Sequence, residues 1–206
     1  EEFLRNTESV FKPLLPTVRS FQTACLCHRS TIVDVSRSTS SQFYDDTDGL
    51  MVDAPGIALR VTGADCPPVM VVDEVQGRMA LVHAGRKGTR INIAGQAAER
   101  MKAAGSEAGQ LKAIIGPGVC AAHYQMPPDI LADFSQYPDA INGAELDLPR
   151  IIRTQLTDAG VVPGNIRDIR ECTFEMREKW FSYRRDTHDG LKFDRPRVQA
   201  FVAMLK

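Results

Sequence analysis

Residues 48–89 constrain the fold most, because this segment alternates short apolar runs with turns rich in glycine and proline. The runs cover residues 57–61, 69–72 and 79–82, and breakers bound each of them. Short apolar runs between breakers are typical of buried strands rather than of helices. The segment therefore predicts neighbouring strands of a buried sheet.

Two of these runs lead into residues that can bind a metal. Cys66 follows the first run and precedes two prolines, which disfavour helix and remove backbone donors. His83 follows the third run and enters a glycine-containing turn with the cations Arg86 and Lys87. A thiolate and an imidazole on rigid strand ends can share a metal ion or a reacting atom.

The composition is that of an ordinary soluble globular protein, with 43% apolar and 25% charged residues. A length of 206 residues favours one domain over residues 1–206, and because the sequence begins with Glu1 we expect some N-terminal residues to be missing. With 25 basic and 26 acidic residues, no net field favours nucleic acid or a membrane surface as a partner.

The cysteines indicate a reducing compartment. There are five of them, an odd number, and the sequence has neither an apolar leader nor a run of about 18 apolar residues. We therefore expect a cytoplasmic protein whose thiols are free to act as ligands, nucleophiles or core residues.

His28 lies between two strand-like ends of residues 18–35, close to Cys25 and Cys27. On a continuous strand the two cysteines would face one side and His28 the other, so the three could converge only with a bulge. We expect both cysteines in the core and keep His28 as a candidate ligand. From the residues alone, a hydrogen-bonded histidine without a metal is the alternative.

Apolar periodicity and breakers predict the remaining elements. Helices are expected over residues 1–15, 89–104, 127–137 and 147–160, the last with Asp147 as its N-terminal cap. Strands are expected over residues 111–115 and within 161–170. Residues 36–48 are expected to form a polar loop, and residues 198–205 a strand or a helix.

Two further groups suit a pocket. Cys120, His123 and Tyr124 directly follow the turn after residues 111–115, although a packed cysteine and a hydrogen-bonded tyrosine are equally compatible with that place. Arg184 and Arg185 follow a cluster of aromatic residues, which is also typical of arginine stacking on a surface.

Several blocks resemble one family in their order and spacing, over residues 20–186. They are CLCHRSTIVDV, DGLMVDAPGIALRVTGADCPPVMVVD, LVHAGRKGT, IIGPGVCAAHYQM, LDLPRIIRTQLTDAGV and CTFEMREKWFSYRRD. The chain resembles the laccase-domain (YfiH-like) family, first described as polyphenol oxidases and later as zinc-dependent purine nucleoside phosphorylases with adenosine deaminase activity.

The resemblance implies a single-domain α/β fold, a layered α/β/β/α sandwich with mixed sheets. It also implies Zn²⁺ held by His28, Cys66 and His83, which leaves a fourth tetrahedral position for water or substrate. Copper is the less favoured metal, because four-copper sites need many more than the four histidines present.

The implied activity is phosphorolysis of adenosine, inosine and 5′-methylthioadenosine, together with deamination of adenosine. A purine nucleoside and phosphate are then the partners, and a homo-oligomer is left open. The expected catalytic residues are Cys66, His83 and Asp65, and the expected substrate and phosphate ligands are Arg86, Lys87, Tyr124, Arg184 and Arg185.

The chain departs from the family pattern at several positions. Arg86 and Lys87 replace Trp-Arg after H-A-G, Leu26 and Arg29 replace Gln and Gly, and His123 stands where cysteine or a small residue is usual. The altered turn at Arg86 and Lys87 motivates one alternative, a nucleoside-binding module with reduced catalysis. A second is a metal-independent Cys/His hydrolase, because cysteine and histidine pairs also serve as nucleophile and base. A copper polyphenol oxidase is less favoured.

Overall fold

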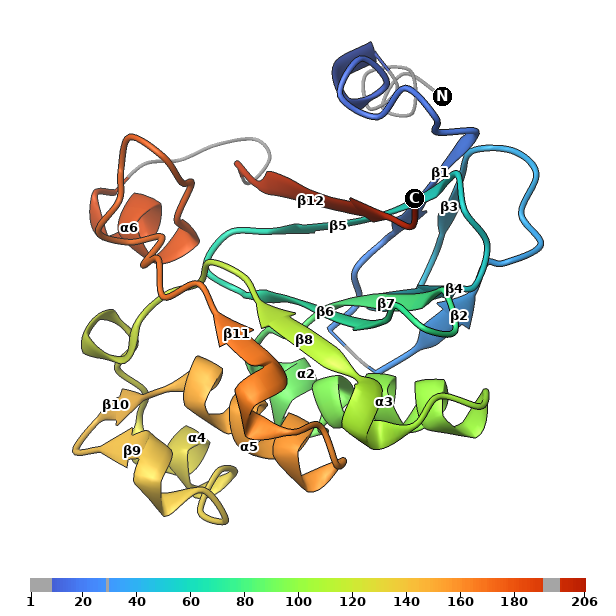
Figure 1. The fold of residues 1–206 in the computed structure, drawn as a ribbon. Helices are drawn as coiled ribbons and strands as arrows, with labels where there is room; N and C mark the ends of the chain where they lie inside the picture. Colours follow the sequence, from blue (N-terminus) through green and yellow to red (C-terminus); the bar gives the residue numbers. More distant parts are fainter. Residues whose placement is uncertain (1–8, 29, 191–196) are drawn as a thin grey trace.

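A computed structural model describes residues 9–28, 30–190 and 197–206 (Figure 1). The predicted helix over residues 1–15 lies mostly outside the described residues, and residues 9–11 at its end are helical. Within the described part of the chain, no helix combines the length and apolar character needed to cross a bilayer.

Two mixed β-sheets lie face to face (Figure 1). The four-stranded sheet has the order β12-β5-β1-β3, with β1 (Ser20–Ala24), β3 (Gln42–Tyr44), β5 (Ile57–Gly63) and β12 (Gln199–Met204). The six-stranded sheet has the order β11-β8-β6-β7-β4-β2, with β2 (Ile32–Asp34), β4 (Gly49–Val52), β6 (Pro68–Asp73), β7 (Arg78–His83), β8 (Lys112–Ile115) and β11 (Ile166–Asp168).

Helices cover the outer face of the six-stranded sheet (Figure 1). They are α2 (Arg86–Arg90), α3 (Ile93–Ala103) and α5 (Leu148–Asp158). A smaller unit beside α5 contains α4 (Pro128–Ala132) and the hairpin of β9 (Ile141–Asn142) and β10 (Glu145–Leu146), and α6 (Tyr183–His188) lies near the end of the chain. Short 3₁₀ turns are η1 (Ala108–Gln110), η2 (Ala121–His123), η3 (Pro138–Ala140) and η4 (Pro163–Asn165).

The central strands are apolar on both faces because both faces are covered. On β7, Met79 and Leu81 pack between the two sheets, whereas Ala80 and Val82 pack under the helices. On the other side of the four-stranded sheet, Phe11 packs in the same cluster as the strand residues of β1 and β5. The result is the expected layered α/β arrangement with mixed sheets.

The apolar runs at 57–61, 69–72, 79–82 and 111–115 are strands, as predicted. The helix predicted over residues 89–104 is wrong in two respects: helix starts already at Arg86, and it is interrupted before α3. Asn92 adopts a left-handed conformation with φ 61° and its side chain caps α3 by accepting a hydrogen bond from the Gly95 N–H.

The other differences are local. The predicted loop over residues 36–48 contains β3, and the helix predicted over 127–137 is limited to α4. The α5 prediction is confirmed, because Asp147 accepts a hydrogen bond from the Arg150 N–H at the start of that helix.

Candidate metal centre

The register of β6 and β7 brings Cys66 and His83 together. In this antiparallel pair Pro68 lies opposite His83, so Cys66, just before β6, reaches the end of β7. The backbone N–H of Ala84 donates to the Pro67 carbonyl at 3.0 Å and holds the two strand ends side by side. In this position the Cys66 side chain is close enough to the His83 imidazole to contribute to the raised pKa of that histidine.

His28 reaches the same place from the other sheet. β1 ends at Ala24, and His28 then adopts a left-handed conformation with φ 61°. The rings of His28 and His83 lie 5.3 Å apart at 82°. The prediction that Cys25 and Cys27 are core residues is wrong: both are only partly buried, because they follow the strand instead of continuing it.

Asp48 is a buried carboxylate that the sequence reading did not single out as a functional residue. Its Oδ1 lies 3.4 Å from His83 Nδ1 and accepts the His28 backbone N–H at 2.9 Å, and its Oδ2 lies 3.0 Å from Cys27 Sγ. A carboxylate on Nδ1 leaves Nε2 of His83 free to bind a metal. The sequence signal would have been an acidic residue just before β4, which pairs with the strand carrying His83.

Gly85 leaves space over the sulfur and the imidazole. A Cβ built on Gly85 would lie 2.6 Å from Cys66 Sγ and 3.2 Å from His83 Nε2, so only glycine leaves this volume free. Two imidazoles and one thiolate are a donor set that suits zinc, with one tetrahedral position open. The residues present therefore fit the metal that the resemblance implies.

The pKa values of the two histidines are shifted in opposite directions. Burial disfavours the charged form of His83, but its interactions with Asp48 and Cys66 outweigh this effect and raise its pKa to about 9. Desolvation of its ring and the nearby His83 lower the pKa of His28. Metal binding would therefore have to displace a proton from His83.

Asp65 is buried next to Cys66, and both of its carboxylate oxygens are engaged. Oδ1 accepts the Thr173 hydroxyl at 2.7 Å, and Oδ2 accepts the Arg184 backbone N–H at 2.6 Å. Asp65 also has a left-handed backbone, with φ 80°. These contacts attach the start of α6 to the turn that carries Cys66 and favour a positioning role for Asp65.

Tyr124 is close to Cys66 and to two arginines, Arg86 and Arg184. The guanidinium of Arg184 lies over the Tyr124 ring at 5.2 Å and donates to the Gln125 carbonyl at 3.1 Å. Burial and the negative charge of Cys66 raise the pKa of Tyr124 to about 12, against the effect of Arg86 and Arg184. The phenol is therefore a hydrogen-bond donor at neutral pH.

The other two predicted anion ligands differ in their surroundings. Lys87 is exposed and close enough to His28 for its charge to contribute to the lowered pKa of that histidine. Arg185 is buried, and its guanidinium donates to the carbonyls of Thr173, Phe174 and Trp180 at 2.7, 3.0 and 2.8 Å. Its donors thus hold the chain that leads into α6.

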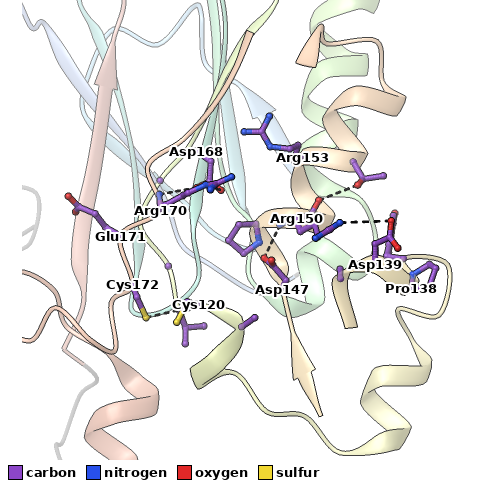
Figure 2. A pocket seen from close by; sticks show the side chains of 18 of the residues that line it. Cys120, Pro138, Asp139, Asp147, Arg150, Arg153, Asp168, Arg170, Glu171 and Cys172 are labelled. Carbon is purple, nitrogen blue, oxygen red and sulfur yellow. Dashed lines mark hydrogen bonds and ion pairs between the residues drawn. The ribbon is translucent and has the colours of Figure 1, made fainter. Parts of the chain in front are cut away.

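A cavity of about 740 Å³ lies next to α5 (Figure 2). Arg150 and Arg153 border it on the side of α5, and Cys120 and Cys172 lie together at its other end. Its lining does not include the three candidate ligands described above. Beside it lie Cys120, His123, Cys172 and Glu175, whose ligand atoms are all within 4.8 Å of one another. Among the described residues this group, and not His28, Cys66 and His83, has its ligand atoms close enough together to hold a metal ion as the side chains stand.

Comparisons with curated proteins give relatives with one shared name. A purine nucleoside phosphorylase of Synechocystis is 32% identical over 172 residues, covering 70% of this chain and 65% of that protein. A purine nucleoside phosphorylase of Mycobacterium tuberculosis is 35% identical over 168 residues, covering 79% and 65%. The chain thus spans about 65% of the length of these relatives.

Solved structures share the fold. The Bacillus licheniformis hypothetical protein YfiH superimposes with a TM-score of 0.84 and 27% identity, over 98% of this chain and 80% of that one. YlmD from Geobacillus stearothermophilus gives a TM-score of 0.83 and 24% identity over the same shares, 98% and 80%. A family model described as multi-copper polyphenol oxidoreductase laccase matches residues 1–193. The chain therefore belongs to the multi-copper polyphenol oxidoreductase laccase family.

Proposed function

We propose that this chain is a zinc-dependent purine nucleoside phosphorylase that acts on adenosine, inosine and 5′-methylthioadenosine and also deaminates adenosine. The observation that carries the proposal is the position of His83, whose ring lies 5.3 Å from that of His28 and which borders the space at Gly85 together with the Cys66 sulfur. The names of the curated relatives support a purine nucleoside and phosphate as substrates.

The metal ligands in this proposal are His28, Cys66 and His83. A zinc ion bound by them would act as a Lewis acid toward the substrate. Asp48 holds the His83 ring through Nδ1, so that Nε2 faces the open volume.

The surrounding cations fit an anionic co-substrate. Arg86 and Arg184 lie near Tyr124, and Lys87 lies near His28. A guanidinium can bind phosphate through two parallel hydrogen bonds. In phosphorolysis a phosphate oxygen forms a bond to C1′ of the ribose while the C1′–N9 bond breaks, which yields ribose 1-phosphate and the free base. The Tyr124 hydroxyl keeps its proton and can donate a hydrogen bond to either substrate.

Deamination uses the same place with water in the role of phosphate. The water oxygen adds to C6 of adenosine and the amino group leaves as ammonia, which yields inosine. Because both reactions consume the same bound adenosine, we expect added phosphate to divert adenosine from inosine and ammonia to adenine and ribose 1-phosphate.

A second candidate is a metal-independent hydrolase with Cys66 as nucleophile and His83 as base. The proximity of these two side chains, which contributes to the raised pKa of His83, supports it. Chelation separates the two proposals: removing zinc abolishes phosphorolysis in the first and leaves activity intact in the second, whereas alkylation of Cys66 stops both.

The decisive experiment incubates purified protein with adenosine and phosphate and measures adenine, inosine, ammonia and ribose 1-phosphate, beside elemental analysis. His83→Ala should lose the products and the zinc held by His28, Cys66 and His83. His188→Ala, an exposed histidine at the end of α6, is the matched control and should retain them. Zinc-loaded protein that yields none of the products would contradict the proposal and support a nucleoside-binding module.

Three further elements of the proposal concern the whole molecule. We propose that residues 1–206 act as one catalytic domain, that the protein works in the cytoplasm, and that it can form a homo-oligomer. Size-exclusion chromatography with light scattering of the full-length protein tests the last point.

A further inference from the structure

Four metal-binding side chains meet where two loops leave neighbouring parallel strands. β8 and β11 pair in parallel, so their carboxyl ends lie at the same edge of the sheet. Cys120 and His123 follow β8, Cys172 and Glu175 follow β11, and the ligand atoms of all four lie within 4.8 Å of one another. A bridge between Gly118 and Cys172 holds the two loops together.

The separations match a tetrahedral zinc site. Nδ1 of His123 lies 3.2 Å from Cys120 Sγ, 4.0 Å from Cys172 Sγ and 3.4 Å from Glu175 Oε1, and Cys120 Sγ lies 3.7 Å from that same oxygen. Around one zinc with ordinary bond lengths, sulfur–nitrogen pairs are about 3.5 Å apart and nitrogen–oxygen pairs about 3.3 Å. Small side-chain shifts would therefore complete the coordination.

The surrounding chain positions the ligands before any ion binds. The His123 ring stacks on Phe174 with a centroid separation of 4.3 Å at 17°. Cys172 is buried, and its sulfur accepts the Cys120 backbone N–H at 3.3 Å. Cys120 and Cys172 also border the 740 Å³ cavity, which provides a path from solvent (Figure 2).

We propose that Cys120, His123, Cys172 and Glu175 form a second zinc site, separate from His28, Cys66 and His83. Two thiolates and an imidazole favour zinc over magnesium or calcium, and a carboxylate completes four-coordination. A closed set of four protein ligands makes the site structural.

An ion at this second site would stabilise the turn before Cys66. Thr173, next to Cys172, donates to the Asp65 carboxylate, and the Val119 N–H, next to Cys120, donates to the Asp65 carbonyl at 2.9 Å. An ion between the two loops therefore fixes both groups that hold Asp65 in its left-handed conformation.

The test counts metal in a variant that lacks the first site. His28→Ala/His83→Ala protein, purified under reducing conditions and dialysed against zinc, should retain about one zinc per chain. Adding Cys120→Ser and Cys172→Ser should remove it, whereas adding Cys25→Ser, a partly buried cysteine outside both groups, should not. With Co²⁺ in place of zinc, the retained site should show a thiolate-to-cobalt charge-transfer band that the Cys120→Ser/Cys172→Ser change abolishes.

A second arm covers the case in which the double-alanine protein does not fold. In the otherwise unaltered chain, Cys120→Ser/Cys172→Ser should lower the zinc content by about one ion per chain, and Glu175→Gln should weaken binding at that site at least about tenfold. Two findings overturn the proposal: folded protein whose zinc content does not depend on Cys120 and Cys172, or a Cys120–Cys172 disulfide found by mass spectrometry in protein kept reduced.

Discussion

The carboxylate of Asp48 lies 3.4 Å from Nδ1 of His83, and both side chains are buried. Asp48 also accepts the backbone N–H of His28. One carboxylate thereby orients two of the three candidate ligands, and its contribution can be measured separately from that of the ligands themselves.

Replacing Asp48 by Asn should lower the affinity for zinc about 10- to 100-fold. The neutral amide forms a weaker hydrogen bond with His83 than the carboxylate does. Competition with a chromophoric chelator measures the change. Asp158→Asn, at an exposed position in α5, is the control and should bind zinc as the unaltered protein does. Equal affinities in both variants would show that Asp48 does not support the metal centre.

Gly85→Ala should abolish zinc binding at the first site while the fold is retained. The added Cβ would lie 2.6 Å from Cys66 Sγ, closer than two such atoms can approach, so the sulfur has to move. Zinc content and circular dichroism together measure this. Gly109→Ala adds a methyl group that meets nothing within 4 Å, and should change neither quantity. If Gly85→Ala protein kept its full zinc content, the ion could not be bound next to Gly85.

The adjacent arginines of α6 should separate stability from substrate binding. Arg185→Ala removes a buried cation bonded to three carbonyls, so we expect the free energy of unfolding to fall by about 3 kcal/mol or more. Arg184→Ala should cost less than about 1 kcal/mol and raise the KM for phosphate. Urea unfolding and steady-state kinetics measure the two effects, and the reverse pattern would assign phosphate binding to Arg185.

Tyr124→Phe should lower kcat/KM without changing the shape of the pH profile between about pH 6 and 9. Because burial and Cys66 raise the pKa of Tyr124 to about 12, the neutral phenol persists across this range and its titration contributes no limb. Tyr183→Phe, an exposed tyrosine, is the control. A basic limb that disappears only in Tyr124→Phe would show that the phenol ionises during turnover.

The sequence allowed the prediction of the central strands and of two site positions. The apolar runs of β5, β6 and β7 are long enough to identify, and Cys66 and His83 stand at their ends, so local pattern sufficed. Which strand ends meet depends on pairing between distant segments. Asp48 enters the site through the pairing of β4 with β7, and that register cannot be derived from local periodicity.

Other features depend on single backbone conformations. The break before α3 rests on the left-handed Asn92, within a segment whose apolar spacing is otherwise helical. The group around Cys120 and Cys172 forms because β8 and β11 are neighbours in the sheet. Along the chain its two halves are far apart, since His123 and Cys172 are 49 positions from one another. The sequence could not distinguish the role of Arg185 from that of Arg184, because the two arginines are adjacent. Only the folded structure shows that the guanidinium of Arg185 donates to buried backbone carbonyls.

His28 extends from the strand β1 of one sheet, whereas His83 ends a strand of the other. A metal ion bound by both histidines would therefore fix the alignment of one sheet relative to the other. A slip by one residue moves a strand about 3.3 Å, far beyond the roughly 0.2 Å that metal–ligand bond lengths tolerate. Loss of the ion would then loosen the alignment of the two layers even in parts of the molecule that never contact the substrate.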